Sequence, residues 1–459
     1  MHDPDGAAGG AVLPPELDEL PVEAGGPAPQ GLLTLPQELL PVQGTGRGQR
    51  APPPCPPDPP ACPLDRDQLL RQCEEALRGR PPRLHRKFVQ LRREDGAPRS
   101  PIRVMQWNIL AQALGEGVDG FVRCPPEALS WSWRKPLILE EILSYRPHLL
   151  CLQEVDHFHD ALRPALAGLG YAGHFCPKPW SPCLQVPGNN GPDGCALFYD
   201  RSRFQLLDST GLRLNAMMVP TNQVGSNQVG GQPGRGPTGG DPKGGGLAPE
   251  AGQVRADQVG VQLGTHLAPP TPPGRALEPG PYPVRPPLVG PSPDLISPQV
   301  AVVTTLRCRD SGRSLAVASV HLKARAGWEW LRSAQGCDLL RHLAARPRPP
   351  DAILVCGDFN AAPAEDVYRR FAASPLGLDS ACKQLSRDGL SEPEFTSWKI
   401  RATGESRGTL DYVWFSRRAL AVDGVLELPS EQQVGPDRLP SRSYPSDHLS
   451  LVCDFSFRD

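Results

Sequence analysis

The stretch Ile353-Leu-Val-Cys-Gly-Asp-Phe-Asn360 places four apolar residues and a glycine before a carboxylate and an amide. A short apolar run that ends at a glycine is typical of a strand buried on both faces. Asp358 and Asn360 would then lie at the strand end, where loops carry functional groups. Asp358 is suited to accept a proton from water, and Asn360 to hydrogen-bond a growing negative charge.

Two earlier apolar runs end in the same way. Val104 to Leu110 is strand-like and contains Asn108, and Leu149-Leu-Cys-Leu152 leads to Glu154. A carboxylate at a strand end is suited to bind a hard cation such as Mg²⁺, with the amide beside it. A single Glu or Asn in such a place is more often a surface or turn residue, so the prediction depends on the whole set.

A histidine near the end of the chain extends this set. His448, in Pro445-Ser-Asp-His448, is suited to donate a hydrogen bond to a phosphoryl oxygen. Its ring needs a carboxylate to fix its tautomer and orientation, and Asp411 is the natural candidate. The alternative for a lone histidine is a structural role.

Several cations suggest a phosphorylated ligand. His321, Lys323 and Arg325 follow a strand-like run, and in an extended segment all three would point to one face. Lys178 and Arg401 add further positive charge, which suits a multiply phosphorylated ligand better than a neutral one. The alternative is a solvated charged rim. Asn189 lies in a sequence typical of a tight turn, which is the first interpretation. A contact between Asn189 and a ligand is the second.

Apolar runs alternate with helical stripes along much of the chain. A short helix is predicted near 66–79, and further helices near 137–145 and 331–343. Leu449 to Phe455 is expected to form the last strand. Mixed strands with interleaved helices predict a layered α/β sandwich with its site at the strand ends.

Composition sets the domain boundaries. The 459 residues include 57 prolines and 47 glycines, and these are clustered. We predict a disordered region over 1–64, a helix and linker over 65–97, and a catalytic domain over 98–459. A Gly- and Pro-rich segment over 224–299 is predicted to be a disordered insertion in that domain.

Charge, cysteine usage and the opening residues restrict location and partners. The net charge of −2 argues against a strongly basic nucleic-acid surface. Thirteen cysteines without a CxxC pair indicate reduced thiols. No apolar run reaches membrane-spanning length, so no membrane association is expected. The opening lacks a signal peptide and a mitochondrial presequence, so a cytoplasmic location is expected, with a mitochondrial form from an alternative start left open.

These phrases together resemble the endonuclease/exonuclease/phosphatase superfamily. The similarity rests on the strings that span 105–112, 151–156, 356–360 and 444–448, which place the chain among relatives of the carbon-catabolite-repressor deadenylases. The resemblance implies a two-layer β-sandwich flanked by helices. The strings at 104–117, 177–182 and 189–197 are similar to a group in that branch whose members are phosphatases. These enzymes remove the 2′-phosphate of NADP⁺ and NADPH to give NAD⁺ and NADH.

The resemblance also implies roles for individual residues. Glu154 would be the principal Mg²⁺ ligand, with Asn108 beside it. Asp358 would activate water, and Asn360 and His448 would stabilise the transferring phosphoryl group. Asp411 would support His448, and His321 would lie against the same phosphate. The phosphates of the substrate would be held by a basic pocket made of Lys178, Lys323, Arg325 and Arg401.

Two other functions remain open from the sequence. Superfamily chemistry permits a 3′ exonuclease specific for mRNA poly(A), although the chain has no leucine-rich repeat domain and no basic tract for a long polyanion. A non-enzymatic regulatory protein is also conceivable, but all of the metal and base residues are retained. RNA or protein partners are not established by the sequence.

Overall fold

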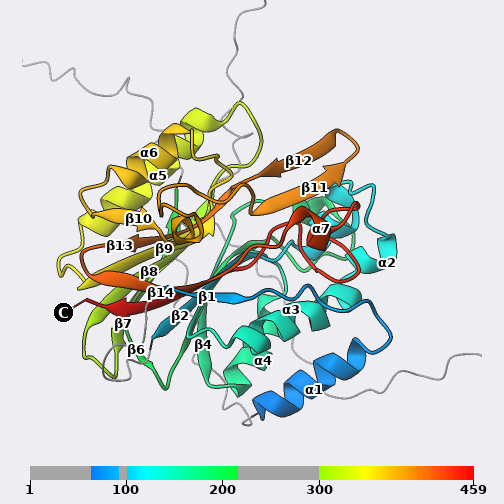
Figure 1. Ribbon diagram of the computed structural model, residues 1–459, viewed down its shortest axis with the longest axis horizontal. Helices are drawn as coiled ribbons and strands as arrows, with labels where there is room; N and C mark the ends of the chain where they lie inside the picture. The colour runs from blue at the N-terminus through cyan, green and yellow to red at the C-terminus, as the bar shows by residue number, and fades with distance from the viewer. Residues whose placement is uncertain (1–63, 92–100, 215–298, 459) are drawn as a thin grey trace, which may run out of the picture. The chain divides into compact units, whose positions relative to one another are not determined.

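Two β-sheets form the framework of the part of the chain that the structure describes. The computed structural model describes residues 64–91, 101–214 and 299–458 (Figure 1). The first sheet has seven strands, in the spatial order β1 (Phe88–Gln90), β14 (Leu420–Leu426), β15 (Leu451–Phe457), β2 (Ile102–Asn108), β3 (Leu149–Val155), β5 (Gly194–Asp200) and β4 (Tyr171–Pro177). The second has six, in the order β10 (Leu378–Ser380), β13 (Asp411–Ser416), β9 (Ala352–Asp358), β8 (Ser314–His321), β7 (Val300–Cys308) and β6 (Phe204–Arg213). A separate hairpin consists of β11 (Ser397–Arg401) and β12 (Gly404–Gly408).

The central strands are buried on both faces, which explains their continuous apolar runs. In β2, Val104 belongs to the core between the two sheets, whereas Met105 belongs to the core beneath the helices. Strand β9 is buried along its whole length for the same reason. The predicted α/β sandwich of two layers flanked by helices is therefore confirmed.

Helices cover the outer face of each sheet (Figure 1). The seven-stranded sheet packs against α1 (Arg66–Ala76), α3 (Trp131–Tyr145) and α4 (Arg163–Gly168). The six-stranded sheet packs against α5 (Glu329–Ala344) and α6 (Asp366–Ala372). Shorter turns complete the described part: α2 (Pro126–Leu129), α7 (Glu431–Val434), two π-helical turns (Leu114–Val118 and Phe158–Leu162) and two 3₁₀ turns (Pro182–Gln185 and Ala381–Leu385).

The N-terminal helix and the segment after it join the first sheet. Asp65 caps α1 by accepting a hydrogen bond from the Asp67 amide at 3.0 Å, so the helix predicted near 66–79 is present as Arg66–Ala76. Strand β1, which the sequence did not predict, pairs antiparallel with β14 at the sheet edge. Part of the predicted linker 65–97 therefore belongs to the sandwich.

Two predicted segments fall almost entirely outside the described residues. These are the N-terminal region 1–64 and the insertion 224–299, of which only Leu64 and Gln299 are described. The residues on either side of the second gap lie next to each other, because the Leu214 amide donates to the Gln299 carbonyl at 2.9 Å. Strands β6 and β7 thus form one antiparallel pair across the gap. Among the described helices, none has the length and apolar character needed to cross a membrane.

Candidate active site

The polar strand ends singled out from the sequence meet at one edge of the sandwich. Strands β2 and β3 run parallel, with Asn108 opposite Gln153. Strands β8 and β9 also run parallel, with His321 opposite Asp358. Parallel strands end at the same edge of a sheet, so each pair delivers its functional groups together. Hydrogen bonds between the two pairs then join the sheets at this edge.

Glu154 is held in an unusual backbone conformation at the end of β3. Its φ angle is 54°, and the pairing of β3 with β5 shifts register around it. Its carboxylate accepts hydrogen bonds from Asn108 Nδ2 at 2.9 Å and from the Ala111 amide at 3.3 Å. Burial raises the pKa of Glu154 to about 7, and the nearby carboxylates of Asp119 and Asp447 add to the shift. A cation beside this carboxylate would relieve that crowding of negative charge.

Asp358 ends β9 and is fully buried. Its carboxylate accepts the Asn360 amide at 2.8 Å and Asn108 Nδ2 at 3.1 Å. Burial raises the pKa of Asp358, as expected for a carboxylate that serves as a base. The Asn108 amide therefore bridges Glu154 and Asp358, while its carbonyl oxygen accepts the Leu110 amide at 3.0 Å.

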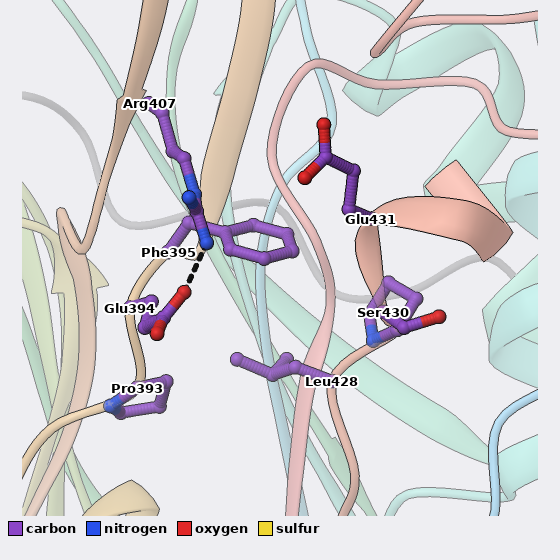
Figure 2. A pocket seen from close by; sticks show the side chains of 8 residues that line it. Pro393, Glu394, Phe395, Arg407, Leu428, Ser430 and Glu431 are labelled. Carbon is purple, nitrogen blue, oxygen red and sulfur yellow. Dashed lines mark hydrogen bonds and ion pairs between the residues drawn. The ribbon is translucent and has the colours of Figure 1, made fainter. Parts of the chain in front are cut away.

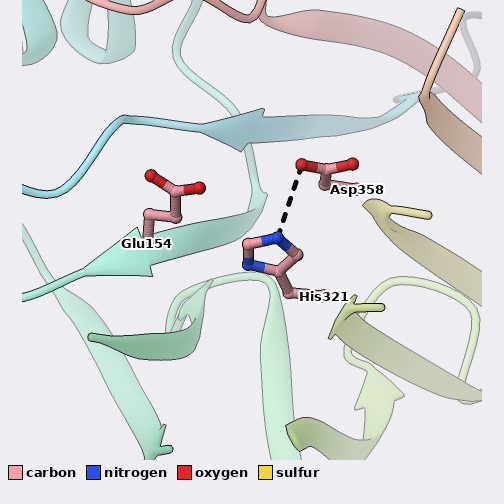
Figure 3. A group of neighbouring side chains, drawn as sticks. All are labelled: Glu154, His321 and Asp358. Carbon is pink, nitrogen blue, oxygen red and sulfur yellow. Dashed lines mark ion pairs between the residues drawn. The ribbon is translucent and has the colours of Figure 1, made fainter. Parts of the chain in front are cut away.

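His321 and Asn360 form the next part of the site. His321 Nε2 lies 3.0 Å from Asn360 Nδ2 and 3.5 Å from an Asp358 oxygen, as Figure 3 shows for the histidine and Asp358. Asn360 has a φ angle of 50° and also donates to the Leu322 carbonyl at 3.1 Å. Burial, reinforced by the cation of Lys178, lowers the pKa of His321 well below its ordinary value. The imidazole of His321 is therefore neutral and can accept the Asn360 hydrogen bond.

His448 and Asp411 form a buried pair. His448 Nδ1 lies 2.8 Å from Asp411 Oδ2, which also accepts a hydrogen bond from Thr396 Oγ1 at 2.7 Å. Gln106 Nε2 donates to the other Asp411 oxygen at 3.2 Å. Burial alone would lower the pKa of His448, but Asp411 and Asp358 raise it to about 9. His448 is consequently an imidazolium at neutral pH, and its Nε2 lies 3.7 Å from Asp358.

The predicted cations occupy different environments. Lys178 is buried and pairs with the buried Asp193 at 2.6 Å. Burial opposes its charge, but Asp193 and Glu154 raise the pKa of Lys178 above its ordinary value. Arg401 pairs with Asp119 at 2.5 Å. Lys178 and Arg401 are therefore charged groups that carboxylates hold in place.

The expectation that His321, Lys323 and Arg325 share one face of an extended segment was wrong. Strand β8 ends at His321, and Arg325 has a φ angle of 78°, so the alternation of a strand does not continue. Lys323 lies over the ring of Trp328 at 5.5 Å, whereas Arg325 is exposed. The loop is held by Arg332, which donates to the Lys323 and Arg325 carbonyls.

Asn189 serves the turn in which it lies. Its Nδ2 donates to the Val186 carbonyl at 2.6 Å, and its side-chain oxygen accepts the Gly191 amide at 2.8 Å. Both polar ends of the side chain are thus engaged locally, and a contact between Asn189 and a ligand stays a prediction.

Three charged residues at the site had no role in the sequence prediction. Lys399 and Asp447 form a short buried ion pair, and Asp119 pairs with Arg401. The alternation of Ser397, Lys399 and Arg401 along a strand would have placed Lys399 on the same face as the predicted Arg401. No comparable pattern in the sequence pointed to Asp119, which precedes a loop that pairs with Arg401 through Phe121.

Comparison with known proteins agrees with this geometry. The model of the Endonuclease/Exonuclease/phosphatase family matches residues 105–448, which reach from the middle of β2 to His448. Nocturnin from Mus musculus is 49% identical over 398 residues, which cover 86% of this chain and 75% of the relative. The chain belongs to the nocturnins of this family. Nocturnin from Xenopus laevis is 48% identical over 400 residues, covering 86% of this chain and 83% of the relative.

A solved structure of the human nocturnin catalytic domain with a bound sulfate anion is also similar. It matches with 44% identity and a TM-score of 0.56, covering 83% of this chain and 100% of that domain. A structure of ANGEL2, described as a 2′,3′-cyclic phosphatase, is 21% identical with a TM-score of 0.53 and shares the fold. Membership of the nocturnins and of this hydrolase family indicates a hydrolytic function that acts on phosphate or nucleic-acid substrates.

The nocturnin site fits a divalent cation. Glu154, His321 and Asp358 each offer a ligand atom within 4.8 Å of the others, and Asp358, Asp411 and His448 form a second such group. The first group fits better, because His448 Nδ1 is engaged by Asp411 whereas Glu154 carries an unfavourable excess of negative charge around it. Asn108 directs its amide nitrogen to the carboxylates, so in this arrangement it supports them and does not present its oxygen.

A separate pocket lies apart from these groups. It has a volume of about 390 Å³, and its walls include Phe395, Arg407, Leu428 and Glu431 (Figure 2). Arg407 pairs with Glu394 and packs over Phe395 at 5.0 Å, so its charge is already engaged. None of the predicted site residues lines this pocket, and it offers no converging set of polar groups for phosphate chemistry.

Proposed function

We propose that this chain is an Mg²⁺-dependent phosphatase that removes the 2′-phosphate of NADP⁺ and NADPH. The products are NAD⁺ or NADH and inorganic phosphate. One observation carries the proposal: two acidic groups suited to a cation, Glu154 and Asp358, lie beside a protonated histidine and fixed cations in a chain that belongs to the nocturnins. The human nocturnin structure, which holds a sulfate anion, supports a binding site for a tetrahedral anion.

The charged groups around the site support this choice of substrate. Asp193 holds Lys178 in place, and Asp119 holds Arg401. The ammonium group of Lys323 makes a cation–π contact with the ring of Trp328. Fixed cations of this kind favour a compact ligand with several phosphates, because each retains hydrogen-bond donors for a second anionic partner. NADP(H) carries three phosphate groups on one small molecule.

Asp358 is the proposed base. The water that attacks phosphorus transfers a proton to the Asp358 carboxylate, whose raised pKa favours acceptance of that proton. The Asn360 amide and Asn108 Nδ2 hold the carboxylate in a fixed orientation during this step. The bond between phosphorus and the 2′-oxygen then breaks, and the 2′-oxygen leaves with a proton from solvent.

His448 and Asn360 are the proposed stabilisers of the transferring phosphoryl group. The imidazolium of His448 directs its Nε2–H at the phosphoryl oxygens, while Asp411 holds Nδ1. Asn360 Nδ2, which lies 3.0 Å from His321 Nε2, is the proposed second donor. Preorganised donors of this kind stabilise negative charge that develops in the transition state.

Glu154 would hold the cation, with Asn108 beside it. Mg²⁺ prefers oxygen ligands and keeps several waters, which suits the Glu154 carboxylate with Asp358 nearby. When bound, the cation neutralises phosphate charge and polarises a phosphoryl oxygen.

The test is phosphate release from NADP⁺ and NADPH by the purified chain, with and without Mg²⁺. Glu154→Ala and Asp358→Asn should lower the turnover number by about 10²–10⁴-fold, the range of general acid–base catalysis. Asp388→Asn, in an exposed turn that pairs with Ser386, is a matched control and should keep wild-type turnover. Unchanged turnover in a folded Glu154→Ala protein, or faster shortening of a poly(A) oligonucleotide than of NADPH, would refute the proposal.

A further inference from the structure

Arg134 carries a buried positive charge that no step of the proposed reaction uses. It lies in the first turn of α3 and is fully buried. Its four hydrogen bonds within the described part of the chain all go to backbone carbonyls, those of Leu129, Ile109, Leu110 and Pro445. Burying a cation is costly, and burial accordingly lowers the pKa of Arg134. The side chain therefore serves as a set of donors that hold the backbone around it.

Nη1 of this arginine joins the segment after β2 to the loop before β15. It donates to the Ile109 carbonyl at 3.0 Å, to the Leu110 carbonyl at 2.8 Å and to the Pro445 carbonyl at 3.3 Å. A further bond between the same two segments runs from Ser446 Oγ to the Asn108 carbonyl at 2.6 Å. The residues that follow Asn108 are thus tied to the loop that leads to the proposed phosphoryl donor.

The turn at Leu110 decides which way the Asn108 amide faces. Leu110 has a φ angle of 61°, and its N–H donates to Asn108 Oδ1 at 3.0 Å. Because a backbone N–H can only donate, the atom that faces it must be the amide oxygen. Asn108 Nδ2 is then left to donate to Glu154 at 2.9 Å and to Asp358 at 3.1 Å. A residue other than glycine is strained at this φ angle, so the turn depends on bonds such as that of its carbonyl to Arg134.

We propose that Arg134 is a positioning residue, which fixes the direction of the Asn108 amide through the turn at Leu110. The inference rests on the proposed function in taking Glu154 and Asp358 as the cation ligand and the base. Arg134 acts through the backbone, since its hydrogen bonds in the described part go to carbonyls and not to these carboxylates. Losing its fork of donors should therefore slow the reaction even where the positive charge is kept.

Arginine-to-lysine substitutions separate the fork of donors from the charge. Arg134→Lys keeps the charge but loses the fork, and should lower kcat for NADPH about 10–100-fold, the cost of misplacing a functional group by up to about 1 Å. KM should change less than about 3-fold, because the proposed phosphate-binding cations are untouched. Arg103→Lys is the matched control, because Arg103 of β2 donates to the Tyr145 carbonyl at the far end of α3, at 3.0 Å. It should keep wild-type kcat, even if it lowers the melting temperature.

A double-mutant cycle tests whether the arginine acts through Asn108. Arg134→Lys should slow the Asn108→Ala protein by less than about 3-fold, because the side chain that the arginine positions is already gone. A general loss of packing would instead lower kcat by the same factor in both backgrounds. Equal factors in the two backgrounds would overturn the inference.

A measurement without substrate decides the inference independently of the proposed function. In NMR spectra of the full chain with isotope-labelled asparagine, the side-chain amide signals of Asn108 are assigned by their loss in Asn108→Ala. These signals should shift in Arg134→Lys and stay in place in Arg103→Lys. If the wild type leaves NADPH intact but this pattern appears, the proposed function fails and the positioning role stands. Asn108 signals that do not move in Arg134→Lys would contradict the role.

Other outcomes also overturn the role. A folded Arg134→Lys protein with wild-type kcat would show that the fork of donors is not needed. If Arg134→Lys does not fold, Arg134→Gln takes its place with the same expected results, since its amide can still donate to one carbonyl. Failure of both variants to fold, while Arg103→Lys folds, would show that the arginine serves the fold alone.

Discussion

Glu154 and Asn360 occupy the left-handed region of backbone conformation, with φ angles of 54° and 50°. A residue other than glycine costs about 1–2 kcal/mol there, and such strain is concentrated at functional sites. The two residues are the proposed cation ligand and a proposed phosphoryl donor. The sequence identified both side chains, because they follow apolar runs, but it contained nothing that predicts their backbone conformation. Hydrogen bonds that form only in the folded chain accompany that conformation. Glu154 accepts one from the Ala111 amide, and Asn360 donates to Leu322 and Asp358.

Cation binding at Glu154 should depend on pH. Burial raises the pKa of this carboxyl to about 7, so in the free protein a proton occupies it below that pH and must leave when the cation binds. Affinity for Mg²⁺ should fall about 10-fold for each pH unit below 7 and level off above it. Calorimetric titration at pH 6 and pH 8 measures the difference. Glu154→Gln should bind weakly at both values, and an affinity independent of pH in the wild type would contradict the assignment of this ligand.

Turnover should decline at high pH because of His448. Asp411 and Asp358 raise the pKa of this imidazole to about 9, so the donor form is present below that value and is lost as the pH rises through it. The profile of kcat/KM between pH 7 and pH 10 should therefore fall above about 9. In Asp411→Asn the falling limb should move to lower pH, since the carboxylate that stabilises the imidazolium is gone. A limb at the same pH in both proteins would exclude His448 as its origin.

At the scale of the element, the site is made by two parallel strand pairs, one hairpin, the start of β13 and the loop before β15. The strands of each pair could be predicted from their apolar runs, and the phrases at their ends could be assigned to chemistry. Their order in the sheets could not, since β15 pairs with β2 and Asp454 lies opposite Arg103, about 350 residues earlier. Strand β11 shows the same limit: its charged face carries Lys399, whose importance depends on a segment nearly 50 residues later in the chain.

Gly357 lets β9 approach β8 closely beside the site. A Cβ added there would lie 2.2 Å from the backbone carbonyl oxygen of Val320, a fully buried residue of β8 whose backbone is fixed by strand pairing. Gly357→Ala should therefore lower the free energy of unfolding by about 1–3 kcal/mol or more, the cost of overpacking. Gly408→Ala is the matched control, because no atom lies within 4 Å of its added Cβ, and it should change stability by less than about 0.5 kcal/mol. Equal denaturant midpoints for the two variants would contradict this.

At the scale of the whole described part, the N-terminal segment is bound to the catalytic core by a buried network. Arg86 donates to the Ser450 carbonyl at 2.8 Å and pairs with Glu141 at 2.7 Å. Ser450 Oγ also donates to Glu141 at 2.8 Å. Ser450 is two residues after His448, so this network is connected to the site through the backbone between them. The sequence predicted the helix in this segment. It did not predict the ion pair of Arg86 with Glu141, or the hydrogen bond from Arg86 to Ser450, which lies 364 positions later.

Truncation should show which N-terminal residues the fold needs. A chain that begins at residue 64 retains α1, β1 and Arg86, and we expect it to match the full chain in melting temperature and turnover. A chain that begins at residue 92 leaves Glu141 buried without its arginines, and breaking a buried pair in this way costs about 3–5 kcal/mol. It should be insoluble or melt at a much lower temperature. A stable, active chain from residue 92 would contradict the structural role of this segment.

The segment 215–298 should be dispensable for the fold. Strands β6 and β7 pair up to Arg213 and Val300, and Leu214 bonds to Gln299, so a short turn suffices to connect them. Replacing 215–298 by a four-residue turn that contains glycine should leave turnover and KM for NADPH within about 2-fold of the full chain. Loss of activity in a folded replacement would show that the segment contributes to the site.

The closeness of Leu214 and Gln299 also has a consequence for how this gene can change. The entropy lost on closing a loop grows only with the logarithm of its length, so extending a four-residue turn to 84 residues costs roughly 3 kcal/mol. Beyond the first few residues, each added codon at this position is almost free of thermodynamic penalty. The hairpin is therefore a place where an insertion, once present, can lengthen with little further loss of stability. The same position would accept a fluorescent reporter or an affinity tag inside the folded enzyme, where both termini of the guest meet neighbouring residues of the host.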